Sequence, residues 1–222
     1  QIVEMNPGLT AVVAYGHQPS ASTQTMPAAS AICAELKRVG PELKTLLVGG
    51  HVAALPDRTL REEKVDFVCR GEGPQTTVGL AHALRSDVPA YSKVPDLSHW
   101  EDGMIRTTPP APLIMDLDNE MPELAWDLLP MEKYRAHNWH CFDGLQREPY
   151  AAVYTTLGCP YHCEFCCIQA PFKSGEATLG YKGEINSYRF WSPMVVVEQI
   201  DRLVHDYNVR NIKIADEMFV LN

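Results

Sequence analysis

Strand-like and helix-like segments alternate three times between residues 9 and 85. The strand-like segments are apolar and rich in β-branched residues, a pattern typical of strands buried on both faces. A helix-like segment follows each of them, the first opening at Pro27, the second spanning 57–63 and the third opening at Pro74. This alternation predicts an α/β fold with parallel strands and right-handed crossovers. The predicted strands are residues 9–15, 45–50 and 65–73.

Glycines and small hydroxyl residues follow these three predicted strands. Parallel sheets bind ligands at the carboxyl ends of their strands, and such residues let a ligand approach the backbone closely. Tight turns alone would also explain the glycines, and a loop hydrogen bond would explain the histidine. There is no GxGxxG pattern, so an NAD-type site has little support. The candidate ligand loops contain Ser20, Ser22, Thr23 and Thr25, then Gly49, Gly50 and His51, then Gly71, Glu72 and Gly73.

Eight prolines interrupt every long periodic pattern between residues 86 and 150, which predicts a connector made of short elements. A β-hairpin is expected to turn at residues 101–103, and the aromatic-rich stretch AWDLLPMEKYRAHNWHCF is expected to pack between two domains. His137, His140 and Cys141 lie close together within that stretch. Packing is favoured over metal binding there, because no second ligand pair at metal-binding spacing accompanies them.

Four of the seven cysteines lie between residues 159 and 167, in a predicted loop after the strand-like segment 151–157. A disulfide is disfavoured, because the odd count and the cysteines in apolar segments indicate a reducing compartment. Structural zinc takes four ligands, usually as two separated pairs. A [4Fe-4S] cluster held by three thiolates would leave one iron open for another ligand. His162 or Cys167 could supply a fourth zinc ligand, but a residue adjacent to a ligand normally points away.

The spacing CxxxCxxC, with an aromatic residue just before the last cysteine, resembles that of the radical S-adenosylmethionine (SAM) superfamily. The resemblance implies that Cys159, Cys163 and Cys166 hold a [4Fe-4S] cluster and that Phe165 lies near the adenine of SAM. In that family the open iron binds the amino and carboxylate groups of SAM, and reduction of the cluster cleaves the sulfonium. Cys167 is extra to the pattern and is interpreted as a buried thiol.

The residues after the cysteines are predicted to begin a TIM-type barrel. Ser192 is expected to cap a helix that starts at Pro193, and residues 209–219 are expected to supply a second strand. Asp216 and Glu217 lie at the carboxyl end of that strand, where radical SAM proteins contact the amino group of SAM, often with a GGE sequence. The resemblance therefore implies that both residues bind SAM.

The order of motifs along nearly the whole chain resembles the cobalamin-binding class of radical SAM enzymes. GGH, DFVCRGEG, the hairpin, AWDLLPMEKY and the cysteine strand follow one another. The resemblance implies a partial flavodoxin-like (Rossmann-like) cobalamin domain followed by the first βα units of a partial TIM-type barrel, with the candidate ligand loops lining the corrinoid. Because the sequence starts at Gln1 and stops after a predicted strand, we expect a fragment of a longer chain. The expected divisions are 1–85, the C-terminal part of the cobalamin-binding domain, 86–150, the connector, and 151–222, the N-terminal part of the radical SAM domain.

The family resemblance implies an enzyme that cleaves SAM reductively and, with cobalamin, methylates or rearranges an unactivated carbon. The fragment alone is expected to be inactive, because the later barrel strands are missing. A radical SAM methylthiotransferase is one alternative, which is disfavoured because Cys33 and Cys69 lie within a predicted helix and strand instead of a second cluster motif. A non-catalytic corrinoid-binding or metal-binding module is the other alternative.

Charge and hydropathy limit the expected partners. A formal charge of −9 without clustered Lys and Arg argues against a nucleic-acid partner. No apolar run approaches the roughly 20 residues of a membrane span, and the N-terminus lacks the pattern of a signal peptide. We therefore expect a cytoplasmic protein that acts on a small molecule, away from membranes, and the resemblance implies an external electron donor of the flavodoxin or ferredoxin type.

Overall fold

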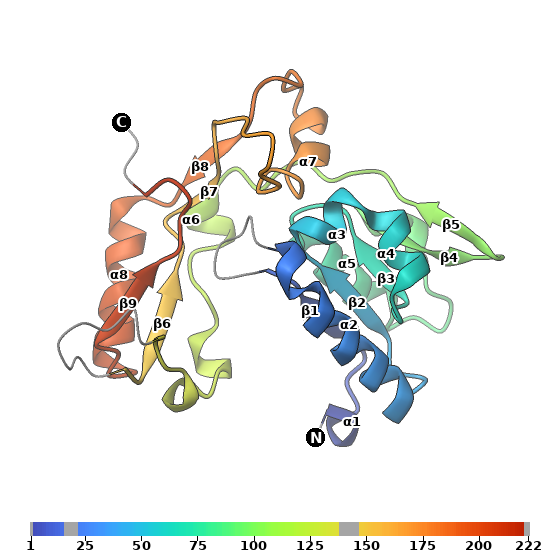
Figure 1. Cartoon of the computed structure of the whole chain (residues 1–222), viewed down its shortest axis with the longest axis horizontal. Helices are drawn as coiled ribbons and strands as arrows, with labels where there is room; N and C mark the ends of the chain where they lie inside the picture. The colour runs from blue at the N-terminus through green and yellow to red at the C-terminus, as the bar shows by residue number, and fades with distance from the viewer. Residues whose placement is uncertain (1, 16–21, 138–146, 220–222) are drawn as a thin grey trace. The chain divides into compact units, whose positions relative to one another are not determined.

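A computed structural model of the chain describes residues 2–15, 22–137 and 147–219. The chain divides into two compact units. Both units combine helices and strands, which confirms the predicted α/β class (Figure 1). Unit 1 comprises Gln1–Leu113 and Pro160–Ser187, and unit 2 comprises Ile114–Cys159 and Tyr188–Asn222.

A five-stranded sheet with the order β1-β2-β3-β4-β5 forms the centre of unit 1. Strands β1, β2 and β3 are mutually parallel, as the alternating pattern predicted. The predicted hairpin is also present, and its first strand joins β3 in antiparallel pairing, so that the hairpin extends the sheet. The strands are β1 (Thr10–Val13), β2 (Thr45–Val48), β3 (Phe67–Cys69), β4 (Leu97–Glu101) and β5 (Met104–Thr107).

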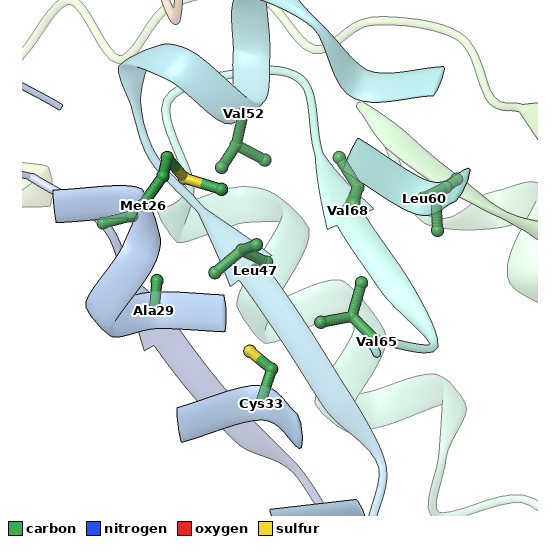
Figure 2. Packing of buried hydrophobic residues seen from close by; sticks show 9 residues of the cluster. Met26, Ala29, Cys33, Leu47, Val52, Leu60, Val65 and Val68 are labelled. Carbon is green, nitrogen blue, oxygen red and sulfur yellow. The ribbon is translucent and has the colours of Figure 1, made fainter. Parts of the chain in front are cut away.

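Two apolar clusters cover the two faces of this sheet, because neighbouring residues of a strand point in opposite directions. Leu47 faces the cluster formed with the helices α2, α3 and α4, whereas Leu46 and Val48 face the cluster that includes Leu80 of α5. Figure 2 shows the first cluster, with Cys33 of α2 among its members. The helices of this part of unit 1 are α1 (Ile2–Met5), α2 (Ser22–Val39), α3 (Gly50–Ala54), α4 (Pro56–Glu62) and α5 (Pro74–Ala83).

Helix α2 begins earlier than the sequence predicted, at Ser22 instead of Pro27. A proline inside a helix removes one backbone donor, but the preceding turn is held here by side chains. The Thr25 hydroxyl donates to the Ser22 carbonyl at 2.8 Å, and the Ser22 hydroxyl donates to the Ala14 carbonyl. The predicted loop residues Ser22, Thr23 and Thr25 are therefore the first turn of α2.

Strand β1 is not buried on both faces, in contrast to the prediction. Its residues alternate between half-buried and exposed, and the Val13 side chain is 61% exposed. Among the described residues β1 pairs with β2 alone, so it is an edge strand of this sheet. A continuous apolar run therefore overstated the burial of this strand.

Unit 2 contains the predicted start of a barrel. Strand β6 (Tyr150–Val153) lies parallel to β9 (Asn211–Ile214), and helix α8 (Pro193–His205) precedes β9 in the chain. The Ser192 hydroxyl accepts the Val195 N–H at 3.4 Å, which confirms the predicted cap. The single strand predicted over 151–157 is wrong, because β7 (Thr156–Gly158) leaves β6 and pairs antiparallel with β8 (Tyr188–Phe190).

Short elements fill the rest of the described chain. Trp126 and Met131 of the predicted aromatic stretch pack with Ala151 and Val153 of β6. His140 and Cys141 lie outside the described residues. Within the described ranges no helix has the length and apolar character to cross a membrane. The short elements are η2 (Tyr91–Lys93), α6 (Leu117–Glu120), η3 (Trp126–Leu128), η4 (Met131–Lys133) and α7 (Lys173–Thr178).

Candidate functional site

The ends of β1 and β2 are tied together by side chains of the first two candidate loops. The buried Ser22 hydroxyl accepts the His51 N–H at 3.0 Å, besides donating to the Ala14 carbonyl. Thr23 Oγ1 lies 3.0 Å from His51 Nδ1. The structure thus brings Ser22, Thr23 and His51 together at the carboxyl edge of the sheet. Ser20 lies outside the described residues.

Gly49 and Gly50 join β2 to α3 in this group. A Cβ atom on Gly49 would lie only 2.5 Å from the Ala14 carbonyl oxygen, so the close approach of the two loops requires glycine there. Gly50 is the buried first residue of α3. Packing between the loops therefore accounts for Gly49, whether or not a ligand also approaches it.

The third candidate loop, Gly71 to Gly73, depends on a residue that the sequence analysis missed. Asp96, which is 3% exposed, accepts the Arg70 N–H through its carbonyl at 2.8 Å. Its carboxylate accepts the Ala111 N–H at 3.0 Å, and a Cβ atom on Gly71 would collide with that carboxylate. The only sequence signal was the turn-like dipeptide Pro95-Asp96.

A small pocket lies beside this third loop. Glu72, Gly73, Asp96 and Ser174 are among the residues that line it. Asp96 Oδ1 and Ser174 Oγ are buried and have no hydrogen-bond partner within the described part of the chain. Because buried polar atoms in proteins are nearly always hydrogen-bonded, these two oxygens suit a pocket that takes a polar ligand group or water.

The cysteine motif begins directly after β7. Cys163 is exposed, Cys159 and Cys166 are half-buried, and the Cys166 N–H donates to the Cys163 carbonyl at 3.0 Å. Cys167 is half-buried as well, so its interpretation as a buried thiol is wrong. Phe165 is 93% exposed. The cysteines within the described ranges form no disulfide, and the described residues include no group of three or more Cys, His, Asp or Glu side chains arranged to hold a metal ion. The three thiols thus lie on one accessible loop, but their present arrangement in the described chain is not that of a metal site.

The buried carboxylate of Glu176, which the sequence did not single out either, joins the two ends of the segment that follows the cysteines. Glu176 Oε1 accepts the Gln169 amide at 2.5 Å and the Ser187 N–H at 2.6 Å, and Lys173 Nζ lies 2.9 Å from Oε2. Burial acts to raise the pKa of Glu176, but the hydrogen bonds from Ser187, Gln169 and Lys173 outweigh it and lower the pKa below its usual value. Nothing in the local sequence distinguishes this glutamate.

Asp216 and Glu217 follow β9 at the carboxyl end of the barrel-like pair. Asp216 Oδ1 accepts the N–H groups of Thr155 at 2.7 Å and Thr156 at 3.3 Å, and Asp216 Oδ2 accepts the Thr155 hydroxyl. Burial raises the pKa of Tyr154, and the charges of Glu217 and Asp216 raise it further. This capture of two amides explains why the predicted strand breaks between β6 and β7.

Part of unit 1 matches a known family. Residues 7–81 match the B12 binding domain. An uncharacterized methyltransferase, PH0819 of Pyrococcus horikoshii, is 33% identical over 91% of this chain. Anaerobic magnesium-protoporphyrin IX monomethyl ester cyclase of a Synechocystis species is 28% identical over 75% of this chain. The chain spans only 39% and 28% of the lengths of these two relatives.

Solved structures show the same fold at lower identity. The radical SAM methyltransferase TsrM from Kitasatospora setae matches with a TM-score of 0.59 and 16% identity, over 95% of this chain and 37% of TsrM. The cobalamin-dependent SAM radical enzyme OxsB matches with a TM-score of 0.61 and 15% identity, over 99% of this chain and 27% of OxsB. Residues 7–81 of the chain therefore match the B12 binding domain, and the fold of the chain is similar to that of these two solved structures.

Proposed function

We propose that the chain is the part of a cobalamin-dependent radical SAM enzyme that carries the corrinoid loops and the cluster loop. The observation that carries this proposal is the order of two features in one chain. A B12-binding domain comes first, and the motif Cys159-x3-Cys163-x2-Cys166 then follows β7, which comes after the strand β6 of the parallel pair. The relatives named as a methyltransferase and a cyclase support methylation or rearrangement of an unactivated carbon as the activity of the whole enzyme.

The loops at the carboxyl edge of the unit 1 sheet would hold the corrinoid. When bound, cobalamin would supply a methyl group or redox equivalents, and the cluster would supply the electron that cleaves SAM. The protein would contribute polar contacts, and two features fit a ligand rich in primary amides. Ser22, Thr23 and His51 form a hydrogen-bonded group at this edge. Asp96 Oδ1 and Ser174 Oγ face a pocket without a partner among the described residues.

The three motif cysteines would hold the cluster. Their thiols fit as a donor set, because they lie at the family spacing, on one accessible loop, and in no disulfide. The loop would close when metal binds, since metal binding and local folding are coupled. Phe165 is exposed and would lie near the adenine of SAM, while the strand end that carries Asp216 and Glu217 would lie near the amino group of SAM.

The expected partners are a small-molecule substrate and an external electron donor of the flavodoxin or ferredoxin type. A formal charge of −9 disfavours nucleic acid, and a cytoplasmic location away from membranes is part of the proposal.

Anaerobic reconstitution with iron and sulfide tests the cluster assignment. We expect a broad visible absorbance from the wild-type chain, its loss in Cys159→Ala, and its retention in the matched control Cys167→Ala. The absence of this absorbance in the wild type, or equal absorbance in Cys159→Ala, would show the assignment to be wrong. One zinc and no iron per chain after anaerobic purification would favour a non-catalytic metal-binding module instead.

A further inference from the structure

We infer that Asp216 is a positioning residue, whose carboxylate holds the chain between β6 and β7 in place instead of contacting SAM. The inference deepens the proposed function, on which its SAM-binding part rests. It concerns residues of unit 2 alone, and its core is a set of hydrogen bonds within the described residues.

The Asp216 carboxylate is largely occupied by its own chain. A carboxylate offers about four lone-pair positions, and three donors point at this one. They are the Thr155 N–H at 2.7 Å, the Thr156 N–H at 3.3 Å and the Thr155 hydroxyl. An ammonium group would have to compete with hydrogen bonds that are already strengthened by the negative charge.

These bonds satisfy backbone donors at a point where the chain changes its strand partner. The chain leaves its parallel pairing with β9 after Val153 and starts antiparallel pairing with β8 at Thr156. Backbone donors at such a change of partner need another acceptor, and the Asp216 carboxylate provides it. The Thr155 carbonyl is also held, because it accepts the Trp191 N–H at 3.1 Å. Thr155 is thus fixed through its amide, its hydroxyl and its carbonyl.

The position held in this way is the one from which the cysteine motif starts. β7 runs directly into Cys159, the first predicted cluster ligand. A carboxylate that follows β9 therefore holds the backbone shortly before the first predicted cluster ligand. Of the two acidic residues at this strand end, Asp216 would support the site and Glu217 would remain the candidate for direct contact with the amino group of SAM.

Variants of Thr155 distinguish a positioning role of Asp216 from direct contact between Asp216 and SAM, because Thr155 is itself no candidate for binding SAM. The variants are Asp216→Ala, Thr155→Val, the conservative Thr155→Ser, and the double variant of Asp216→Ala with Thr155→Val. The measurement is SAM affinity, followed through the electron paramagnetic resonance spectrum of the reduced cluster, with iron and sulfide content as the control for cluster assembly.

If Asp216 acts through Thr155, Thr155→Val should weaken SAM binding by about tenfold, since it removes one charge-assisted hydrogen bond, and Asp216→Ala should weaken it by at least as much, since it removes all three. Thr155→Ser should bind SAM as the wild type does, and the double variant should be no weaker than Asp216→Ala. If Thr155→Val keeps wild-type affinity while Asp216→Ala loses it, Asp216 contacts SAM directly and the inference is wrong.

Hydrogen exchange of the chain without any cofactor supplies a readout that does not depend on the proposed function. Asp216→Ala should speed amide exchange at Thr155 and Thr156 by at least tenfold, whereas Glu198→Ala, an exposed carboxylate on α8, should leave it unchanged. Unchanged exchange in Asp216→Ala would overturn the positioning role. A wild-type chain that assembles no cluster, but shows the expected exchange, would overturn the proposed function alone.

Discussion

Gly71 shows how a single residue can fix a candidate ligand loop. The Asp96 carboxylate occupies the space where a Cβ atom would stand, and Asp96 is held by Arg70 and Ala111 on either side. Gly71→Ala is therefore expected to destabilise the chain by about 1–3 kcal/mol, the usual effect of overpacking, and to weaken hydroxocobalamin binding. Thermal unfolding and absorbance titration with hydroxocobalamin measure the two effects.

Gly8→Ala is the matched control for this prediction, because a Cβ atom on Gly8 would meet nothing within 4 Å. Equal unfolding midpoints and equal cobalamin affinities for Gly71→Ala and the wild type would contradict the role assigned to Asp96.

Among single residues, the sequence placed two buried thiols correctly but missed two buried carboxylates. Cys33 and Cys69 were expected inside a helix and a strand, and both are buried there. Asp96 and Glu176 were missed, because the groups that make their burial tolerable are donors in irregular segments, such as Ala111 for Asp96 and Gln169 for Glu176, which no helix or strand periodicity marks. Glu176, for example, accepts an N–H from Ser187, whose position depends on the return of the segment after the cysteines. No local pattern encodes such a contact.

The segment between the cysteine motif and β8 depends on one buried ionised group. Because hydrogen bonds lower the pKa of Glu176, its contribution to stability is fully present above the unfolded pKa, about 4.3. That contribution is lost as the pH falls through the lower, folded pKa. Glu176→Gln should lower the free energy of unfolding by about 1–3 kcal/mol at pH 7, since it disturbs several buried hydrogen bonds. Below pH of about 4.3 the variant should lose less stability than the wild type, because the protonation of Glu176 no longer contributes.

Thermal unfolding by circular dichroism at pH 7 and at acid pH measures this effect. Glu184→Gln, an exposed change in the same segment, should behave like the wild type at both values. A Glu176→Gln variant that is as stable as the wild type at pH 7 would show that the buried carboxylate is not what holds the segment.

Elements were predicted where the hydrophobic pattern is local, and were misplaced where tertiary contacts decide their ends. The helix after Gly73 and the cap at Ser192 follow the sequence rules closely. Helix α2 starts before its proline because Ser22 is anchored to Ala14. The run 151–157 appeared to be one strand, but Asp216, far along the chain, takes the amides at its centre.

At the scale of the whole molecule, the topology followed from the order of motifs. The alternation over residues 9–85 fixed three parallel strands, but the pattern did not show that the hairpin continues their sheet. The grouping of Pro160–Ser187 with the first 113 residues was also not visible, because it depends on contacts without periodicity. The expected domain boundaries after residues 85 and 150 stay a prediction.

The distribution of cysteines over the whole chain predicts how much iron it can hold. Burial, followed by the charge of Glu63, raises the pKa of Cys33 to about 11, and burial dominates a similar rise in Cys69, also to about 11. Thiolates are the ligands of iron, and burial disfavours the thiolate form of these two cysteines beyond what holds for an ordinary cysteine. Neither cysteine therefore suits a second cluster of the kind that a methylthiotransferase carries.

Anaerobically reconstituted chain should accordingly contain about four irons and about four sulfides, as one cluster requires. Cys33→Ala should leave these amounts unchanged, because a helix-buried thiol facing Leu47 and Val65 is a core side chain, whereas Cys163→Ala should abolish most of them. Iron and acid-labile sulfide assays supply the numbers. About eight irons per chain, falling to four in Cys33→Ala, would instead favour the methylthiotransferase alternative, since only a second cluster with Cys33 as a ligand would produce that loss.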